Sequence, residues 1–599
     1  MMTGKKFWMA SAALLALSAA ANAAEPANSA ATTTAKKASA AKSVQPVQVQ
    51  LAQATPVQMA QNTYGQDSTA SGSLEARVKA LEDALAAQND RASSDRTRLS
   101  TLEQNYNYAS WTFDNGRPVL ATGDGRFTMA IRVRFQTDFA GFQQSTTHPA
   151  GFAGPADLST GTDIRRAYFG VEGKVYNDFN YEIRLNGGGT NGGLNTTCTN
   201  PTITSTTTIA GAPGATATTT STAAGCAIGG VANGSDGDSL INKAVITYAG
   251  IPFWHFNVGV IEPALMFEGT TSSASLMFLE RPEIDNIAAD SFGAGDSREG
   301  IEIGWSKSDT LWAGDNLAAT GAFTGRKTGT AATHGNGGDE NTQVLGRVSD
   351  RLWTDGLSNI QLGFSAAKAL YTGNSAGGGS QTLNFQDRPE IRVDGTRLVS
   401  TGGMAAKTGN MYAVDLGGNI DNFFLGGEYA HFTADRQCGA LTAVNNPRCI
   451  TSTSVVDHPS FGGWYVEGSW IITGETKVYS PSAINNEVGG FNAPVPSKPF
   501  SLAGGSWGAW ELVARYSDTN LNWNPLVTAV TNTAGTSNLA GVLGGDEKIL
   551  ALGINWYLNR NVRLMIDDNI VKVKKGTAAI PNRDGQSLNI VGVRLQFAN

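Results

Sequence analysis

The sequence predicts an all-β transmembrane barrel of antiparallel strands that follows a helical coiled-coil segment. Apolar and polar residues alternate through many segments after residue 120, which is the pattern of strands with two unlike faces. Short turns and long polar loops also alternate along this region, and aromatic residues stand near the segment ends. After the first residues, no apolar run reaches the roughly 18 residues that a membrane-spanning helix requires. We therefore expect about 16 strands, and at most about 18.

The bulk composition is compatible with this fold class. The 599 residues are 41% hydrophobic, and their mean hydropathy of −0.18 is typical of a soluble protein. In a barrel only alternate residues face lipid, so a polar average is expected. The net charge of −7 argues against a nucleic-acid partner.

Residues 1–23 have the pattern of a secretory signal peptide. Two lysines precede a short apolar run, and Ala21-Asn22-Ala23 matches an A-x-A cleavage site. Residues 24–72 are rich in Ala, Thr, Ser, Gln and Pro and lack the apolar residues of a core, which predicts a flexible linker. We expect residues 120–599 to form a barrel in the cell outer membrane, with the segment before it in the periplasm.

Residues 73–107 change to a helical period. Apolar residues recur every three or four positions as a heptad seam with a polar middle, which predicts a short coiled coil. The alternative is a lone amphipathic helix lying on another surface. A coiled coil with a seam of only a few heptads is marginally stable by itself, so other contacts must also hold the chains together. The seam residues are Leu74, Val78, Leu81, Leu85, Leu99 and Leu102.

The stretch "RFTMAIRVRFQ" (126–136) indicates what the polar strand face contacts. Arg126, Arg132 and Arg134 take even positions, and large apolar residues take the odd positions. A slip of one residue would turn these arginines into lipid, at ~2–4 kcal/mol for each at the membrane midplane. The polar faces are therefore expected to line a water-filled lumen.

Basic residues on the polar strand faces are the candidate pore lining. Rings or ladders of Arg and Lys attract anions in a narrow channel of low dielectric. Alternatively, these residues pair with acidic residues on neighbouring strands and only brace the wall. The candidates are Arg126, Arg132, Arg134, Arg166, Lys174, Arg184, Lys243 and Arg515.

The four cysteines form two local pairs that flank polar stretches. For an exported protein this arrangement predicts two loop-stapling disulfides, Cys198–Cys226 and Cys438–Cys449. A metal site is the alternative, but the sequence has no C-x-x-C motif and His431 stands alone nearby.

Several stretches resemble the phosphate-selective porins, the porin O and P type of Gram-negative outer membranes. They include "RRAYFGVEGKVYNDFNYEIRL" (165–185), "RPEIRVDGTRLVSTG" (388–402) and "GINWYLNRNVRLM" (553–565). The resemblance runs from residue 120 to the last residue. It implies a homotrimer in outer-membrane lipid and an inward-folded loop in each pore, for which residues 266–283 are the candidate.

These observations predict a passive, trimeric outer-membrane porin that prefers phosphate or other small anions. A general small-solute porin without anion selectivity is the first alternative. A structural anchor that links the barrel to peptidoglycan through the N-terminal extension is the second, and a trimeric adhesin is the third. The sequence contains no H-x-x-x-H, nucleophile-elbow or phosphate-loop motif, so no enzymatic activity, cofactor or metal is expected.

Overall fold

The computed structural model describes residues 70–107, 109–114, 116–144, 158–189, 198–199, 202–208, 216–222, 225–226, 240–328, 340–373, 382–438, 455–481, 488–525, 530–531, 537–538, 541–575 and 585–599. The predicted signal peptide lies outside these residues, as does the predicted linker up to residue 69. No helix in this part of the chain is both long and apolar enough to cross a membrane.

Helix α2 (Ala70–Asn107) covers the segment with the heptad seam. Leu74, Val78, Leu81, Leu85, Leu99 and Leu102 are all exposed on it. The predicted helix is therefore confirmed. Its pairing with other helices stays a prediction.

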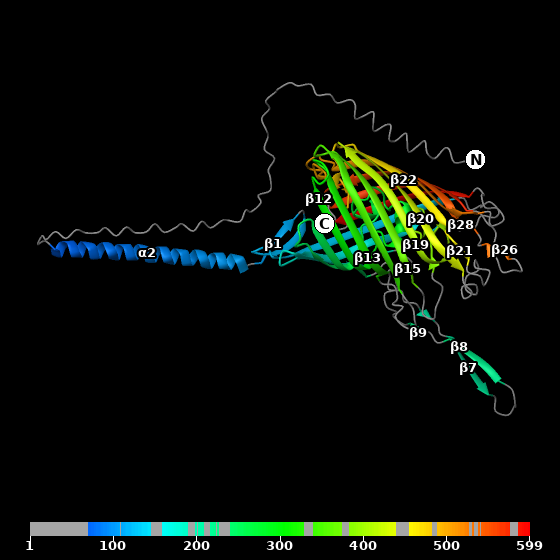
Figure 1. Cartoon of the computed structure of the whole chain (residues 1–599), viewed down its shortest axis with the longest axis horizontal. Coiled ribbons are helices and arrows are strands. Elements are labelled where there is room, and N and C mark those ends of the chain that lie inside the picture. The colour runs from blue at the N-terminus through cyan, green and yellow to red at the C-terminus, as the bar shows by residue number, and fades with distance from the viewer. Residues whose placement is uncertain are drawn as a thin grey trace, which may run out of the picture. The chain divides into compact units, whose positions relative to one another are not determined.

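Within the described residues, sixteen strands form one closed antiparallel barrel (Figure 1). The barrel closes where the last strand pairs with the first, with Asp138 opposite Arg594. This confirms the predicted fold class, at the lower end of the expected strand number. The strands are β3 (Phe127–Gln144), β4 (Gly161–Val175), β5 (Phe179–Asn186), β10 (Ile241–Tyr248), β11 (Trp254–Ile261), β12 (Arg298–Ser308), β13 (Asn316–Lys327), β14 (Asn341–Thr354), β15 (Asn359–Thr372), β19 (Met404–Ile420), β20 (Phe423–Cys438), β22 (Ser460–Ile471), β25 (Ala509–Trp523), β28 (Val542–Tyr557), β29 (Val562–Lys574) and β30 (Gln586–Ala598).

The two faces of each strand separate as the alternation predicts. On β3, Phe135 and Phe139 are exposed on the outside, whereas Arg134, Gln136 and Asp138 are buried on the inside. A soluble barrel would not leave such large apolar residues on its outer face, so the exposed face is the one that meets lipid.

Short turns join the strands at one end of the barrel, except between β22 and β25, whose longer connection contains the third inner segment described below. The turn predicted at Asn177-Asp178 joins β4 to β5, and Tyr176 and Asn177 adopt positive φ angles there. Aromatic side chains gather at this end, where they pack in pairs such as Trp510 and Trp556, whose ring centroids lie 5.1 Å apart. This clustering is the arrangement of an interfacial aromatic girdle.

Smaller elements accompany the barrel. The hairpin β1 (Ala109–Asp114) and β2 (Arg117–Thr122) extends the sheet beside the start of β3, and the rest lie in the connections between barrel strands. These are β6 (Cys198–Thr199), β7 (Thr202–Thr208), β8 (Thr216–Thr222), β9 (Gly225–Cys226), β16 (Thr382–Leu383), β17 (Gln386–Asp387), β18 (Val399–Ser400), β21 (Val455–Asp457), β23 (Val478–Ser480), β24 (Gly490–Asn492), β26 (Val530–Thr531) and β27 (Ser537–Asn538).

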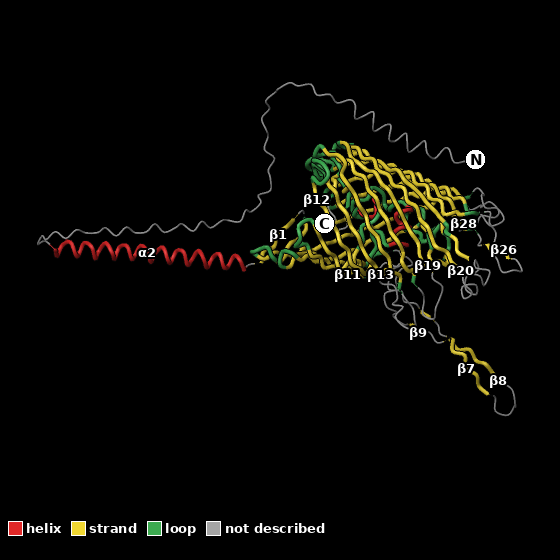
Figure 2. The backbone as a smooth tube through the Cα atoms, in the orientation of Figure 1, coloured by secondary structure: helices red, strands yellow, loops and turns green. Residues whose placement is uncertain are grey.

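Three connections fold into the lumen, where helices and loops are visible behind the strands in Figure 2. The first inner segment (262–297) contains α3 (Phe267–Thr270) and α4 (Glu283–Phe292). The second inner segment spans 382–403. The third comprises 474–481 and 488–497. Their contacts with inward-facing strand residues, described below, place all three inside the barrel.

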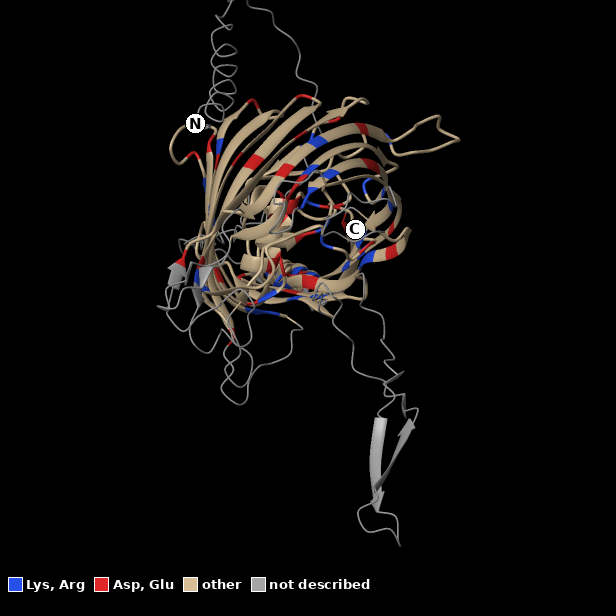
Figure 3. Ribbon diagram, turned by 90° about the vertical axis from the view of Figure 1, so that its right-hand side faces the viewer, with Lys and Arg blue, Asp and Glu red and all other residues tan. Residues whose placement is uncertain are grey.

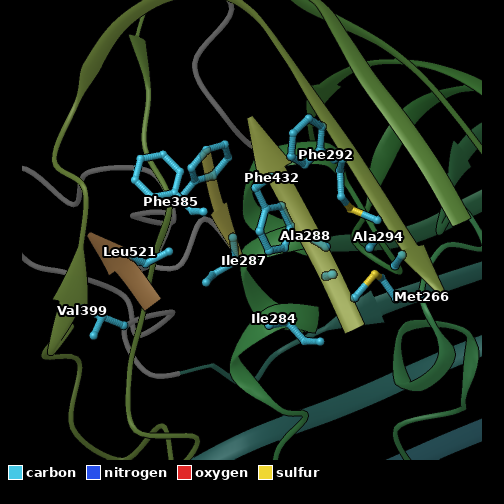
Figure 4. Close-up of a cluster of buried hydrophobic side chains, with 14 of the residues drawn as sticks. Met266, Ile284, Ile287, Ala288, Phe292, Ala294, Phe385, Val399, Phe432 and Leu521 are labelled. Atoms are coloured by element: carbon cyan, nitrogen blue, oxygen red, sulfur yellow. The ribbon is translucent and has the colours of Figure 1, made fainter. Parts of the chain in front are cut away.

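The inner segments share a hydrophobic core with the barrel wall. Figure 4 shows Ile287 and Phe292 of α4 close to Phe385 of the second inner segment and Phe432 of β20. The ring of Phe292 lies 6.1 Å from that of Phe385 and 6.4 Å from that of Phe432. This core fixes α4 against β20, whereas the first cavity described below lies beside β3, β4, β5 and β10.

Candidate pore and its charged lining

The residues from Glu268 to Glu283, here termed the crossing stretch, span the lumen. The backbone N–H of Leu279 donates to Asp567 on β29 at 2.6 Å. Arg563 donates to the Leu276 carbonyl at 2.8 Å, and Asn555 donates to the Met277 carbonyl at 2.9 Å. These contacts attach the stretch to the inner face of the last barrel strands, so the predicted inward loop at 266–283 is confirmed.

One cavity of about 160 Å³ lies between the crossing stretch and the wall formed by β3, β4, β5 and β10. The hydroxyl groups of Thr270, Thr271, Ser272 and Ser273 line one side of it. Its basic side chains outnumber its acidic ones, and Figure 3 shows how both kinds are distributed along the ribbon. The basic residues are Arg132, Arg134, Arg165, Arg166, Arg184, Lys243, Arg281, Lys327 and Arg392, and the acidic residues are Glu262, Glu280, Asp290 and Asp296.

A second cavity of about 370 Å³ lies toward the end with the short turns, where Asn559 and Asn561 line it. It shares Arg132, Arg134 and Ser272 with the first cavity. The two cavities therefore border one another at these three residues. Together they outline a path along the basic wall that passes Arg134.

Several basic residues of this wall pair with carboxylates, as the bracing alternative predicts. Arg132 contacts Glu172 at 2.8 Å and Glu182 at 3.3 Å. Glu182 also forms an ion pair with Lys243, whose Nζ atom lies 3.0 Å from a carboxylate oxygen of Glu182. Arg184 forms a close ion pair with Glu262, at the start of the first inner segment. These residues form a chain of alternating charge across β3, β4, β5 and β10.

Arg134 differs from these residues because the hydrogen bonds that it donates go to neutral groups. It donates to the hydroxyl of Ser273 at 2.5 Å and to that of Ser272 at 3.0 Å. Its Nε atom has no hydrogen-bond partner among the described residues. The guanidinium also lies 5.6 Å from the ring centre of Tyr168. A buried cation with neutral partners is a strong attractor for an anion.

Glu280 of the crossing stretch is surrounded by guanidinium groups. Arg165 contacts it at 2.7 Å, Arg594 at 2.8 Å, Arg392 at 3.6 Å and Arg166 at 3.8 Å. Burial alone would raise the pKa of Glu280, but these cations outweigh burial and hold the pKa well below its usual range. The carboxylate is therefore ionised at neutral pH and neutralises part of the arginine cluster.

The predicted pore-lining residues fall into two groups. Arg132, Arg134, Arg166, Arg184 and Lys243 come together around the first cavity. Arg126, Lys174 and Arg515 line neither cavity. Arg126 pairs with Asp124, Lys174 is exposed near the Asn177 turn, and Arg515 is buried against Glu390 at 2.5 Å.

Sequence reasoning missed Arg165, because strict alternation assigns Arg165 and Arg166 to opposite faces. The pairing of β3 with β4 skips between Gln136 and Asp138, which leaves an extra residue on β4. Such a bulge allows neighbouring residues to point the same way, and both arginines are buried inside. The two consecutive arginines, Arg165 and Arg166, were the feature of the sequence that could have indicated this bulge. Arg281, Lys327 and Arg392 were also missed, and Arg281 and Arg392 lie on inner segments without a strand period.

The cysteines are only partly described. Cys198 on β6 and Cys226 on β9 are register partners in a two-stranded ladder. Cys438 ends β20, and Cys449 lies outside the described residues. Both disulfides stay predictions.

An outer-membrane β-barrel with a lumen narrowed by inner segments and a charged path beside them defines the porin class of channels. The sequence model of the family described as phosphate-selective porin O and P matches residues 129–598. The chain belongs to this family. Fold and family point to a channel rather than an enzyme.

Among solved structures, the chain is similar to a loop L8 deletion mutant of OmpT, an outer membrane protein of Vibrio cholerae. The TM-score is 0.38 at 10% identity, over 79% of this chain and 100% of that one. It is also similar to an anion-selective porin from Comamonas acidovorans, with a TM-score of 0.36 at 11% identity, over 79% and 100% of the two chains. The chain is similar as well to the outer membrane channel DcaP of Acinetobacter baumannii, with a TM-score of 0.36 at 8% identity, over 79% of this chain and 97% of that one. No curated protein sequence matches the chain.

Proposed function

We propose that the protein is a passive outer-membrane porin that prefers small anions such as phosphate. The single observation that carries this proposal is Arg134, a buried guanidinium with neutral hydrogen-bond partners at the junction of two cavities. An anion passing this point gains a charge-assisted hydrogen bond without first breaking an ion pair.

The surroundings of Arg134 suit an oxyanion. Ser272 and Ser273 place hydroxyl groups beside the guanidinium, and these groups can accept or donate hydrogen bonds as protonation of the permeant requires. The excess of basic residues around the first cavity raises the local anion concentration in a site partly shielded from water. Ion pairs with Glu172, Glu182 and Glu262 limit this excess, which favours passage over tight retention.

The test is the reversal potential of the purified protein in a planar bilayer across a KCl gradient, followed by a phosphate titration of the chloride current. We expect a chloride-selective potential and block by phosphate. Arg134→Gln should weaken the block roughly tenfold, because a charge-assisted hydrogen bond is lost, whereas Arg134→Lys should retain most of it. Arg126→Gln is the matched control, since Arg126 lies on neither cavity.

Two results would contradict this proposal. A cation-selective or neutral potential that phosphate does not change would favour a general small-solute porin. Equal block of wild type and Arg134→Gln would place the anion contact elsewhere on the wall.

A homotrimer with a periplasmic coiled coil is the second part of the proposal. The exposed seam of α2, from Leu74 to Leu102, is a set of apolar residues that parallel copies of the same helix would bury. Three barrels side by side would compensate for the shortness of this seam. Chemical crosslinking in membranes should give trimers.

The exposed seam also favours a second candidate function, an anchor from the barrel to peptidoglycan. Deletion of residues 24–105 separates the two functions. Conductance should survive the deletion if the protein is a porin, whereas envelope integrity should suffer if the extension is an anchor.

A further inference from the structure

Both ends of the crossing stretch carry a buried glutamate that meets a glutamate of the barrel wall. Glu283, at the start of α4, lies within hydrogen-bond distance of Glu547 on β28. Glu268, at the other end, meets Glu467 on β22 in the same way. Relative exposure is 0% for Glu283 and Glu547, 5% for Glu268 and 1% for Glu467.

Three of these four glutamates lack hydrogen-bond donors among the residues that the structure describes. Among the described residues, no group donates a hydrogen bond to either carboxyl oxygen of Glu283, Glu547 or Glu467. Two ionised carboxylates have no proton to share and repel each other in a dry site. A pair that holds one proton, by contrast, forms a short charge-assisted O–H to O⁻ hydrogen bond.

The charged groups around the Glu283–Glu547 pair do not supply the missing positive charge. Asp387 and Glu390 of the second inner segment face the pair and add negative charge. Lys575, which follows β29, faces Glu547, but its ammonium group donates to the Leu398 carbonyl at 3.2 Å. The positive charges of Arg388 and Arg392 stabilise the ionised form of Asp387, and Arg515 is already paired with Glu390.

The surroundings of the Glu268–Glu467 pair are similar. Asp285 lies close to Glu268, and Glu428 and Arg281 face Asp285. Lys477 faces Glu467, and Nη1 of Arg515 lies 3.6 Å from Glu467, but the same guanidinium donates to Glu390. Burial, together with Glu268, raises the pKa of Asp285 to about 8, and burial together with Glu547 raises the pKa of Glu283 well above its usual range. In the described part of the chain, no three Asp, Glu, His or Cys side chains are grouped as ligands for a metal ion. Protons are therefore the counterions that this geometry accommodates.

We propose that shared protons in the Glu283–Glu547 and Glu268–Glu467 pairs hold both ends of the crossing stretch on the barrel wall, and that their loss at alkaline pH loosens the stretch and widens the pore. This inference rests on the proposed channel function, because the same stretch lines both cavities. The apolar contacts of Phe292, in the last turn of α4, with Phe385 and Phe432 do not titrate, so they hold the C-terminal end of α4 while Glu283 and the rest of the crossing stretch move (Figure 4).

The experiment is the chloride conductance of the full-length protein in planar bilayers, with phosphate absent because phosphate itself titrates. Between about pH 6 and about pH 10 we expect conductance to rise reversibly by roughly twofold, with larger current noise, as the pairs lose their shared protons. Glu283→Gln combined with Glu268→Gln should remove most of this rise, because a glutamine amide donates to the remaining wall carboxylate at every pH. Glu299→Gln is the control, since Glu299 lies outside the lumen at the end of β12 and pairs with Arg326.

Several outcomes would overturn the proposal. A wild-type conductance that does not change with pH would refute the proposal without measurements on any variant. A rise that persists in the double variant would assign the effect to other groups. A rise that a calcium chelator reproduces at neutral pH would show that a divalent cation, not a proton, neutralises the pairs. The reversal potential measured in the same bilayers tests anion selectivity separately, so failure of the pH response leaves the porin proposal intact.

Discussion

Arg594 and Asp138 form a two-point ion pair across the seam that closes the barrel. Nε and Nη2 of Arg594 on β30 donate to the two carboxylate oxygens of Asp138 on β3, both at 2.6 Å. The same guanidinium reaches Glu280 of the crossing stretch at 2.8 Å. One side chain therefore links the closing seam of the barrel to the crossing stretch.

Arg594→Gln should destabilise the barrel strongly. The substitution leaves Asp138 buried without its counter-ion, and removing one partner of a buried pair costs ~3–5 kcal/mol. Urea unfolding followed by tryptophan fluorescence in detergent or lipid measures this loss. Arg326→Gln, which breaks the partly exposed pair with Glu299, should cost at most ~1 kcal/mol. Equal losses in the two variants would show that the seam pair does not stabilise closure.

A pair of glycines on the barrel wall makes room for Phe267 at the start of the crossing stretch. Gly417 on β19 and Gly426 on β20 are register partners. A Cβ atom at Gly417 would lie 2.5 Å from the Phe267 ring, and one at Gly426 would lie 2.9 Å from it. The ring therefore occupies a recess that exists because two side chains are absent.

Gly417→Val should displace Phe267 and with it the crossing stretch. We expect a loss of ~1–3 kcal/mol in unfolding free energy from overpacking, and a changed single-channel conductance. Gly141→Val is the control, because a Cβ atom at Gly141 has no neighbour within 4 Å among the described residues. A folded Gly417→Val variant with wild-type conductance would mean that Phe267 does not set the position of the stretch.

Strand patterning predicted the barrel well but described its lumen poorly. The alternation through β3 identified Arg132 and Arg134 as inward-facing because one face must satisfy lipid along the whole strand. The bulge on β4, between the register pairs of Gln136 and Asp138, escaped this reasoning, since a bulge changes the register without changing the composition. Arg165 was lost for that reason alone.

The second and third inner segments were not predicted for a different reason. Phe385, Ile391 and Phe491 are buried, but the sequence around each mixes apolar residues with polar, charged, Gly or Pro residues, so no sustained helical or strand period marks them. Their burial depends on partners far away in the sequence, such as Phe461 for Phe385. The ion pairs of Glu280, Glu262 and Glu390 also join residues that are far apart in the sequence, so the sequence pattern did not predict them. These pairs determine which arginines of the wall are neutralised.

Barrel stability should fall as the pH rises, in part through Asp285. Its carboxyl accepts a hydrogen bond from the Gly269 N–H at 2.7 Å, and its folded-state pKa is about 8. Because this pKa lies above the unfolded value of ~4, the contribution is complete below about pH 4 and is lost progressively as pH rises toward 8. Four pKa units correspond to an upper limit of roughly 5 kcal/mol.

Asp285→Asn should reduce this decline, which unfolding free energies at about pH 5 and about pH 9 measure. Asp178→Asn in the exposed turn between β4 and β5 serves as the control and should follow the wild type. Glu280 acts with the opposite sign, because its lowered pKa gives stability at neutral pH that is lost only as the solution becomes strongly acidic. A stability profile of Asp285→Asn that is parallel to the wild type would exclude Asp285 as a contributor.

Glu262→Gln should strengthen phosphate binding in the pore. Glu262 is the carboxylate that forms a close ion pair with Arg184 beside the first cavity, and Arg184 also stacks 5.0 Å from the ring of Tyr168 that Arg134 faces. Without this carboxylate, Arg184 can share its charge with a passing anion, and we expect phosphate to block chloride current at concentrations roughly threefold to tenfold lower. The gain should shrink at high ionic strength, because added salt screens the interaction.

The matched control for this prediction is Glu302→Gln, an equally inward-facing glutamate on β12 that lines neither cavity. It removes the same formal charge from the lumen wall. If net lumen charge alone governed anion affinity, the two variants would respond equally. A response confined to Glu262→Gln would instead locate the anion path between Arg134 and Arg184, on the wall that lines the first cavity.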